Sequence, residues 1–407
     1  MNNSRFKALL GTTFLSLVMG GTAYAGGFSR GTADTDIIYE DGNFNMRSGV
    51  TYVSPRREYT KNFNPDLVGT SYTEDYVIPS AAVKLNLANN FRCAATFVQN
   101  LGGSSKYDAP TIGNKTLEEF TTYESAATCG VSFDVGPGKL WALGGGYVEA
   151  LDYLRKNDYG ALGGATLDLD GQRYGYRIGA AYEIPDIALR GQIMYRSGTD
   201  YGAEGTATAP RGVLFGALKA QGVPDISNPF AGGDPTAQTP VSAMGVGSLP
   251  QSVDIKFQTG IAPGWLAFGG VRWTDWSTLT TLDVRSTVGG VLLSSDKYFW
   301  RDGWTVTGGV GHKFNDTVSG LVSLTWDRGV STGWDLQSDT YTVAAGASFK
   351  DKLGGELRTG IGFTYLTSAE ETQYSLAAAP GSLHFGSNSA VKAGYAVALN
   401  LGYNIKW

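Results

Sequence analysis

The stretch YESAATCGVSFDV at residues 123–135 alternates strictly between two kinds of side chain. Tyr123, Ala127, Val131 and Phe133 fall on one face, and the positions between them carry small or polar residues. Successive residues of a β-strand point to opposite faces, so this pattern predicts a strand with one apolar side. Strands of membrane barrels show such alternation, with the apolar face toward lipid, but strands of soluble sandwiches show it too.

The same alternation recurs along the chain and is longest at residues 393–407. Most of the alternating segments reach the roughly 9–11 residues that a tilted membrane strand needs, whereas strands of soluble proteins average about 5–6. The repetition therefore favours a membrane barrel. The predicted strands are about 44–54, 76–88, 91–101, 119–135, 139–153, 172–184, 187–199, 251–261, 264–276, 299–314, 317–328, 338–350, 354–367 and 390–407.

The connections between these fourteen segments differ in length, depending on whether they follow an even-numbered or an odd-numbered strand. Turns of a few residues follow the even-numbered strands, as at 88–90 and 136–138, and longer loops follow the odd-numbered ones. Short periplasmic turns and long external loops are typical of outer-membrane barrels, and an even strand count puts both termini on the periplasmic side. The predicted fold class is all-β, a 14-stranded antiparallel transmembrane β-barrel over residues 44–407. The terminal Trp407 resembles the end signal that assembly machinery reads on such proteins.

The composition agrees with this fold class. Glycine accounts for 57 of 407 residues, which is too many for a helical protein, and only 17% of the residues are charged, against about 25% in soluble domains. The net charge of −5 argues against nucleic acid as a partner.

The first 25 residues are interpreted as a secretory signal peptide. Arg5 and Lys7 precede an apolar run, and the segment ends in the small-residue pattern Ala23-Tyr24-Ala25. No run of 18 apolar residues follows, so the mature chain is not expected to cross a membrane as helices. We expect cleavage after Ala25.

The sequence offers little for catalysis, and no enzyme, cofactor or metal site is expected. His312 and His384 are the only histidines and lie far apart, and no nucleophile elbow or nucleotide-binding motif is present. Cys93 and Cys129 fall on the apolar faces of neighbouring strands, so they are either a disulfide or two small lipid-facing residues.

Four short strings resemble one family of outer-membrane proteins. They are Tyr195-Arg196-Ser197, Leu249-Pro250, the WTDWS string at 273–277 and the RDGW string at 301–304. In this order and spacing they resemble the FadL/TodX family of transporters for long-chain fatty acids and hydrocarbons.

The resemblance implies a barrel plugged by an N-terminal hatch, here residues 26–43 with Phe28 and Tyr39. It also implies an external hydrophobic groove that captures ligand, and release sideways through a gap in the wall at a kinked third strand. The Asn-Pro-Ala element of the family's hatch is absent before the first strand.

A fatty acid needs apolar surface for its tail and a cation for its carboxylate. Alternation turns five cations toward the lumen, because a charge facing lipid is costly. They are candidate carboxylate-binding residues: Arg173, Arg177, Arg190, Arg196 and Lys256. Alternatively, these cations pair with lumenal acids such as Glu124, Glu183 and Asp254 and only hold the barrel together.

The longest loop, about residues 200–248, contains the candidate capture residues. Leu214, Phe215 and Leu218 form a short helical stripe, and Phe230 follows in a turn-rich stretch. They either pack the loop against the barrel mouth or make a landing surface for apolar ligands.

The sequence thus predicts a monomer in the outer membrane of a Gram-negative bacterium, in contact with lipid and lipopolysaccharide. Its predicted function is passive transport of hydrophobic small molecules, most of all long-chain fatty acids or related acyl compounds. Acylated signals and aromatic hydrocarbons stay open as ligands. A water-filled porin for polar solutes is the main alternative function, and an adhesive barrel is a third.

Overall fold

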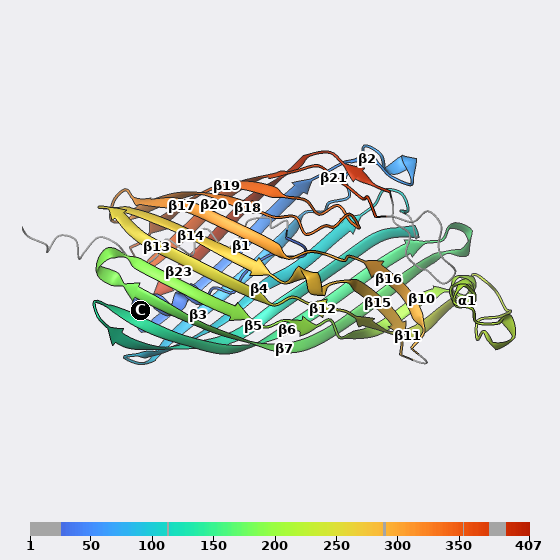
Figure 1. Ribbon diagram of the computed structural model, residues 1–407, viewed down its shortest axis with the longest axis horizontal. Coiled ribbons are helices and arrows are strands. Elements are labelled where there is room, and N and C mark those ends of the chain that lie inside the picture. Colours follow the sequence, from blue (N-terminus) through green and yellow to red (C-terminus); the bar gives the residue numbers. More distant parts are fainter. Residues whose placement is uncertain (1–25, 112–113, 288–289, 353, 374–387) are drawn as a thin grey trace, which may run out of the picture.

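A computed structural model describes residues 26–111, 114–287, 290–352, 354–373 and 388–407 (Figure 1). The predicted signal peptide and His384 lie outside the described residues. Fourteen long antiparallel strands form the wall: β1 (Phe44–Arg56), β3 (Tyr76–Ala88), β4 (Phe91–Lys106), β5 (Lys115–Val135), β6 (Gly138–Asp158), β7 (Gly164–Ile184), β8 (Leu189–Arg196), β13 (Ser252–Ala262), β14 (Trp265–Thr274), β17 (Gly303–Lys313), β18 (Val318–Asp327), β19 (Thr340–Lys350), β20 (Gly355–Leu366) and β23 (Gly394–Lys406).

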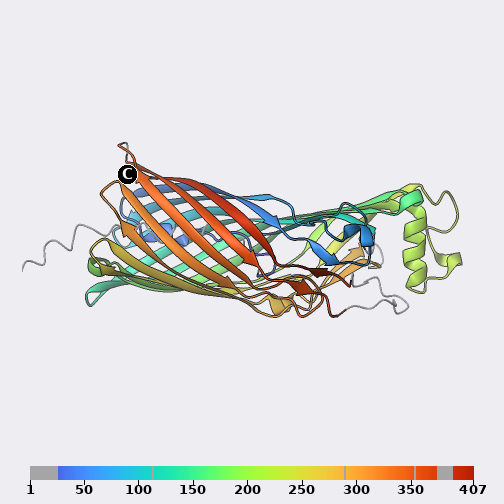
Figure 2. The ribbon, with the colours of Figure 1, turned by 90° about the horizontal axis from the view of Figure 1, so that it is seen from above.

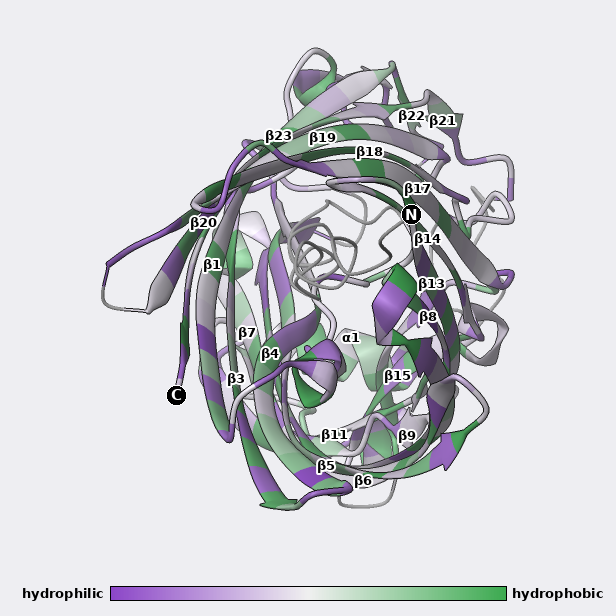
Figure 3. Cartoon of the chain, turned by 90° about the vertical axis from the view of Figure 1, so that its left-hand side faces the viewer, coloured by the Kyte–Doolittle hydropathy of each residue, from purple (hydrophilic) through white to green (hydrophobic). Residues whose placement is uncertain are grey.

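The wall closes because the first and last strands pair. β1 and β23 run antiparallel in an unbroken register from Asn45↔Lys406 to Arg56↔Tyr395. Figure 3, a view along the barrel, shows the strands as a closed ring in which hydrophilic and hydrophobic residues alternate. Closure of the ring removes the two outer strand edges that an open sheet would expose. The predicted fold class is confirmed, and each predicted segment overlaps one wall strand.

The two faces of the wall separate as the alternation predicts. On β5, Ala127 is exposed on the outside whereas Thr128 is fully buried on the inside. Large apolar side chains such as Ile178, Leu324 and Phe363 are more than half exposed on the outer surface. This outer band is the surface that a barrel presents to lipid.

Four strands extend well beyond the predicted segments, and the first of them, β4, ends at Lys106 rather than near residue 101. β5 begins at Lys115, β6 ends at Asp158 and β7 begins at Gly164, so most of residues 154–171 is strand rather than loop. The reason is a small external sheet, in which β10 (Ala203–Pro210) pairs with the outer part of β7 and continues through β11 (Gln238–Val246), β15 (Thr281–Ser286) and β16 (Leu292–Lys297). The helix α1 (Arg211–Ala220) sits at the tip of this extension, far from the end that carries the C-terminus (Figure 2).

The remaining elements are short. They are η3 (Thr35–Tyr39), β2 (Tyr59–Lys61), η4 (Pro65–Leu67), η6 (Gly160–Leu162), η7 (Pro185–Ile187), β9 (Thr199–Asp200), η8 (Asp225–Ser227), β12 (Ser248–Leu249), η9 (Trp276–Thr278), β21 (Ala369–Glu370) and β22 (Ala390–Val391). None of the described helices has the length and apolar character to span a membrane.

A disulfide joins two neighbouring wall strands. Cys93 on β4 and Cys129 on β5 are register partners and are bonded to each other. The sequence left open whether these cysteines form a disulfide or are two small lipid-facing residues, and in the structure they form a disulfide.

The segment before β1, residues 26–43, lies inside the barrel. Its helix η3 is buried throughout, and Ile37, Ile38 and Tyr39 pack against inward-facing side chains of five wall strands. Charged contacts fix it as well: Asp36 pairs with Lys256 of β13 at 3.0 Å. The lumen is therefore occupied by the chain's own N-terminal segment.

Candidate functional site

A cavity of about 700 Å³ lies between the N-terminal segment and the external loops. Phe28 and Arg30 of that segment, wall residues of β4 to β7 and loop residues such as Tyr298 line it. Volumes of roughly 300–1,000 Å³ are usual for sites that enclose a small organic ligand. The cavity is thus large enough to hold one.

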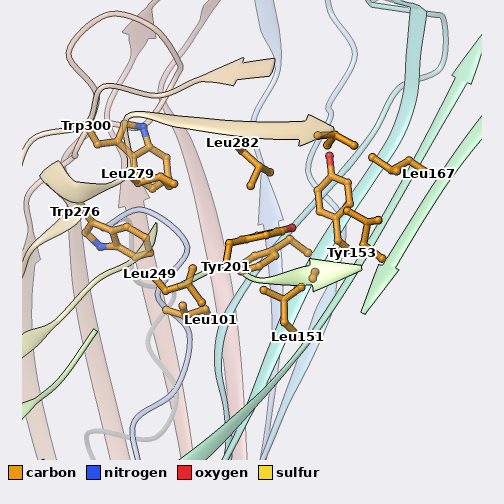
Figure 4. Close-up of a cluster of buried hydrophobic side chains, with 14 of the residues drawn as sticks. Leu101, Leu151, Tyr153, Leu167, Tyr201, Leu249, Trp276, Leu279, Leu282 and Trp300 are labelled. Carbon is orange, nitrogen blue, oxygen red and sulfur yellow. The ribbon is translucent and has the colours of Figure 1, made fainter. Parts of the chain in front are cut away.

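Much of the cavity wall belongs to one buried apolar cluster, part of which is drawn in Figure 4. Its members come from segments far apart in the sequence, namely β4 to β7, the loop around Tyr201 and the connection between β14 and β17. The side chains that belong to the cluster and also line the cavity are Phe120, Tyr153, Leu167, Tyr201, Leu249, Leu279, Leu282, Val284 and Trp300.

Phe28 brings the N-terminal segment into this cluster. Its ring centroid lies 5.1 Å from that of Phe120, 5.0 Å from Trp300 and 6.0 Å from Trp276. Gly27 permits this close approach, since a Cβ at Gly27 would come within 2.6 Å of the Trp276 ring and its φ of +59° disfavours other residues. The N-terminal segment therefore makes an aromatic floor of the cavity.

A compact charged group lies on one side of the cavity. Arg155 Nη1 contacts Asp296 at 3.1 Å, Lys115 contacts both Asp296 and Glu118, and the hydroxyl of Tyr153 donates to Glu118 at 2.6 Å. These charges neutralise one another, so the group contributes polar but balanced surface to the cavity wall.

The third wall strand, β4, bends away from its neighbour β3 beside the cavity floor. Pairing between these strands ends at Ser80↔Val98, and residues 98–102 are all buried, which breaks the alternation. The N-terminal segment occupies the edge that β3 leaves free: Arg30 N donates to Asn100 O at 2.9 Å, and Gly102 N donates to Phe28 O at 2.7 Å. A short piece of the N-terminal segment thus takes the place of a wall strand.

Four of the five predicted carboxylate-binding cations, Arg177, Arg190, Arg196 and Lys256, lie in the lumen, but they do not form one open site. Arg177 and Arg196 are register partners on β7 and β8, and both contact the buried carboxylate of Glu124. Arg196 also contacts Glu149 at 3.0 Å. This arrangement is the internal ion-pair network that the sequence left as an alternative.

The other three predicted cations lie at separate places. Lys256 pairs with Asp36, and Arg190 lies 4.4 Å above the Tyr39 ring and donates to Gln258 at 3.3 Å. Both serve to hold the lower part of the N-terminal segment. Arg173 lies higher, at an outer hollow that Thr199 and Asp200 also line.

The predicted capture residues divide into two kinds. Leu214 and Leu218 are buried on α1, and Leu214 lines the cavity. Phe215 and Phe230 are half-buried at the external tip, where Asn228 Nδ2 donates to the carbonyl of Phe215 at 3.0 Å.

Arg30 is a residue that sequence reasoning missed. The only available signal was a single arginine in an otherwise uncharged run, residues 26–33, which has no regular periodicity.

His312 stacks on Trp265 with ring centroids 4.3 Å apart. Within the described ranges, no three His, Cys, Asp or Glu side chains are grouped so that they could hold a metal ion.

A closed fourteen-stranded barrel with an apolar outer band and an N-terminal segment in its lumen defines an outer-membrane channel of the plugged kind. Residues 43–320 match the family described as outer membrane protein transport protein (OMPP1/FadL/TodX), and the chain belongs to this family. The resemblance seen in the sequence is confirmed. The protein is therefore an outer-membrane transport protein of Gram-negative bacteria, and its family and fold are those of channels rather than enzymes.

Solved structures share this fold at low sequence identity. A Pseudomonas aeruginosa FadL homologue is 14% identical with a TM-score of 0.72, over 91% of this chain and 92% of that one. The Pseudomonas putida toluene transporter TodX is 13% identical with a TM-score of 0.61, over 98% of both chains. The Ralstonia pickettii toluene transporter TbuX is 12% identical with a TM-score of 0.59, over 98% of this chain and 99% of that one. No curated protein sequence matches the chain.

Proposed function

We propose that this protein carries hydrophobic small molecules passively across the outer membrane, with long-chain fatty acids or related acyl compounds as its ligands. The observation that carries the proposal is the cavity of about 700 Å³, walled by an apolar cluster and floored by Phe28. Burial of apolar surface would drive a ligand into it from water.

Capture begins, in this proposal, at the external extension. Leu214 and Leu218 face inward from α1, and Phe215 and Phe230 keep part of their surface open beside them. An apolar ligand that lands on this tip would then move along the wall of the extension toward Leu167 and the cavity.

Exit runs sideways, through the wall between β3 and β4. Residues 28–31 of the N-terminal segment pair with β4 at residues 99–102 through a few backbone hydrogen bonds, and farther along β4 Lys106 N donates to Tyr72 O. Displacing this short piece would open a route from the cavity floor toward the lipid, without a water-filled path through the polar lumen below.

The ligand could instead be an aromatic hydrocarbon. Two of the similar structures are described as toluene transporters, and the floor around Phe28 is rich in aromatic rings. The balanced charges around Arg155 tolerate a polar head group at the wall, which favours the acyl ligand. We further propose that the protein works as a monomer whose outer band contacts lipid and lipopolysaccharide.

Quenching of tryptophan fluorescence tests the proposal. Trp300 lines the cavity and Trp276 lies in the same cluster, so a brominated dodecanoic acid should quench both in a saturable way. Trp334 lines the cavity too, so replacing Trp276, Trp300 and Trp334 together by phenylalanine should remove the saturable component. Trp265→Phe, which alters a tryptophan 41% exposed on the outer surface, should leave it unchanged. Quenching that never saturates would mean that the acid only partitions into detergent, and would contradict the proposal.

A further inference from the structure

Arg30 lies at the floor of the cavity in an unusual state for a lumenal cation. Only 6% of the residue is exposed, and its Nε donates to the carbonyl of Gly102 at 2.9 Å. Its Cζ lies 3.2 Å from the centre of the Tyr76 ring, and its Nη1 has no hydrogen-bond partner. One strong donor of this guanidinium is thus buried and unused.

The charges around Arg30 do not balance it. Within the described part of the chain, Arg47, Arg177 and Lys256 each contact a carboxylate, whereas Arg30 and Arg190 do not, and of these two only Arg30 lines the cavity. Among the residues that the structure describes, no carboxylate lies within 4.0 Å of Arg30. A buried cation without an anion is costly, so this position favours the arrival of one.

A purely structural role accounts for part of the arrangement only. Gly102 belongs to β4 and Tyr76 to β3, so Arg30 bridges the two strands where their pairing has ended. The bridge uses Nε and one face of the guanidinium. It leaves Nη1 without a partner.

The surroundings fit an amphipathic anion. Arg30 and Phe28 line the same cavity, so a head group at Arg30 would have its tail among Phe28, Phe120 and the apolar cluster. The planar fork of an arginine matches a carboxylate, and ionised partners make shorter and stronger hydrogen bonds.

We propose that Arg30 binds the anionic head group of the ligand, so that the cavity selects hydrophobic acids over neutral hydrocarbons. This inference rests on the proposed function, because it requires that the cavity holds the transported ligand. It assigns the head-group site to the N-terminal segment itself, rather than to the paired arginines of β7 and β8.

The test compares an acid with its ester. Purified full-length protein in a non-ionic detergent is titrated with dodecanoic acid and with methyl dodecanoate at about pH 8, where the acid is ionised. Wild type should bind the acid more tightly. Arg30→Gln should weaken acid binding about ten- to hundredfold and leave ester binding unchanged, the size expected for one charge-assisted hydrogen bond. Lys392→Gln, which removes an exposed cation that does not line the cavity, is the control and should change neither.

Each outcome decides a different question. Equal binding of acid and ester by wild type would overturn the role of Arg30 and leave the proposed function standing. Failure of wild type to bind acid, ester or toluene would overturn the proposed function itself. Equal loss of acid and ester in Arg30→Gln would mean that Arg30 only bridges β3 and β4. If Arg30→Gln does not fold, Arg30→Lys, which keeps the charge, must retain the preference for the acid, and losing it would overturn the proposal.

Discussion

The ring of Phe28, near the start of the N-terminal segment, lies 5.0 Å from the ring of Trp300, in the connection between β16 and β17. Edge-to-face and tilted aromatic pairs at such distances stabilise one another beyond the burial of their area, by about 0.5–1.5 kcal/mol. The contact joins the segment inside the lumen to the external side of the protein. In our proposal, this one side chain both helps to close the channel and forms the floor of the ligand cavity.

Replacing Phe28 by alanine should therefore affect both properties. We expect Phe28→Ala to weaken binding of dodecanoic acid at least tenfold and to raise the ion conductance of the barrel in a planar bilayer. Phe314→Ala is the control, since Phe314 is 65% exposed beside the turn that leads into β18. A Phe28→Ala variant that binds dodecanoic acid and conducts ions like wild type would show that Phe28 contributes neither to ligand binding nor to closure of the channel.

Spin labels can test the register of β5. Ala127 is exposed on the outer face, and Thr128 is fully buried inside. A label at Ala127 should be accessible to oxygen dissolved in lipid, and a label at Thr128 should be shielded from it. Equal accessibility at the two positions would contradict the register, because a shift by one residue exchanges the faces.

Glu124 should matter to stability more than to ligand choice. Its carboxylate is 2% exposed and contacts both Arg177 and Arg196. Glu124→Gln leaves two adjacent buried cations short of a partner, so we expect the free energy of unfolding in urea to fall by about 3–5 kcal/mol. Glu58→Gln, which breaks the exposed pair with Lys392, should cost less than about 1 kcal/mol. Unchanged stability with selective loss of acid binding would instead assign the head group to the arginines of β7 and β8.

Gly31 should be needed for the contact between the N-terminal segment and β4. A Cβ at Gly31 would come within 2.5 Å of Val98 Cγ2 and 2.8 Å of the Gln99 carbonyl. Gly31→Ala should thus displace residues 28–31 and give an ion conductance above that of wild type. Gly191→Ala, where a Cβ meets nothing within 4 Å, should behave as wild type. Identical conductance of both variants would mean that this contact does not seal the wall.

Much of the fold follows from one regularity. Because lipid lies outside the barrel and a polar lumen inside, apolar and polar residues alternate along each wall strand. This alternation allows the strands to be predicted from the sequence. The external parts of β6 and β7 were predicted as loop because they leave the membrane; there β6 pairs with β5 and β7, and β7 pairs with β10 as well. Their outward faces are polar, as at Asp168 and Asp170, so the apolar alternation fades although the strands continue.

The site was less predictable for a related reason. Alternation predicts that Arg177 and Arg196 point inward, but not that both contact Glu124, since this depends on the register of the four strands β5 to β8. Arg30 belongs to a segment without periodic structure, and its neighbours Tyr76 and Gly102 come from wall strands. Only the three-dimensional arrangement reveals a buried cation at the floor of an apolar cavity.

Uptake into proteoliposomes tests the central claim most directly, because it separates a plugged transporter of hydrophobic molecules from a water-filled pore. Liposomes carrying the wild-type protein are supplied with labelled dodecanoic acid and, in parallel, with sucrose as an osmotic probe. The account predicts protein-dependent uptake of the acid above that of protein-free liposomes, and no protein-dependent swelling in sucrose. Rapid swelling in sucrose without any gain in acid uptake would contradict the account and identify the protein as a porin.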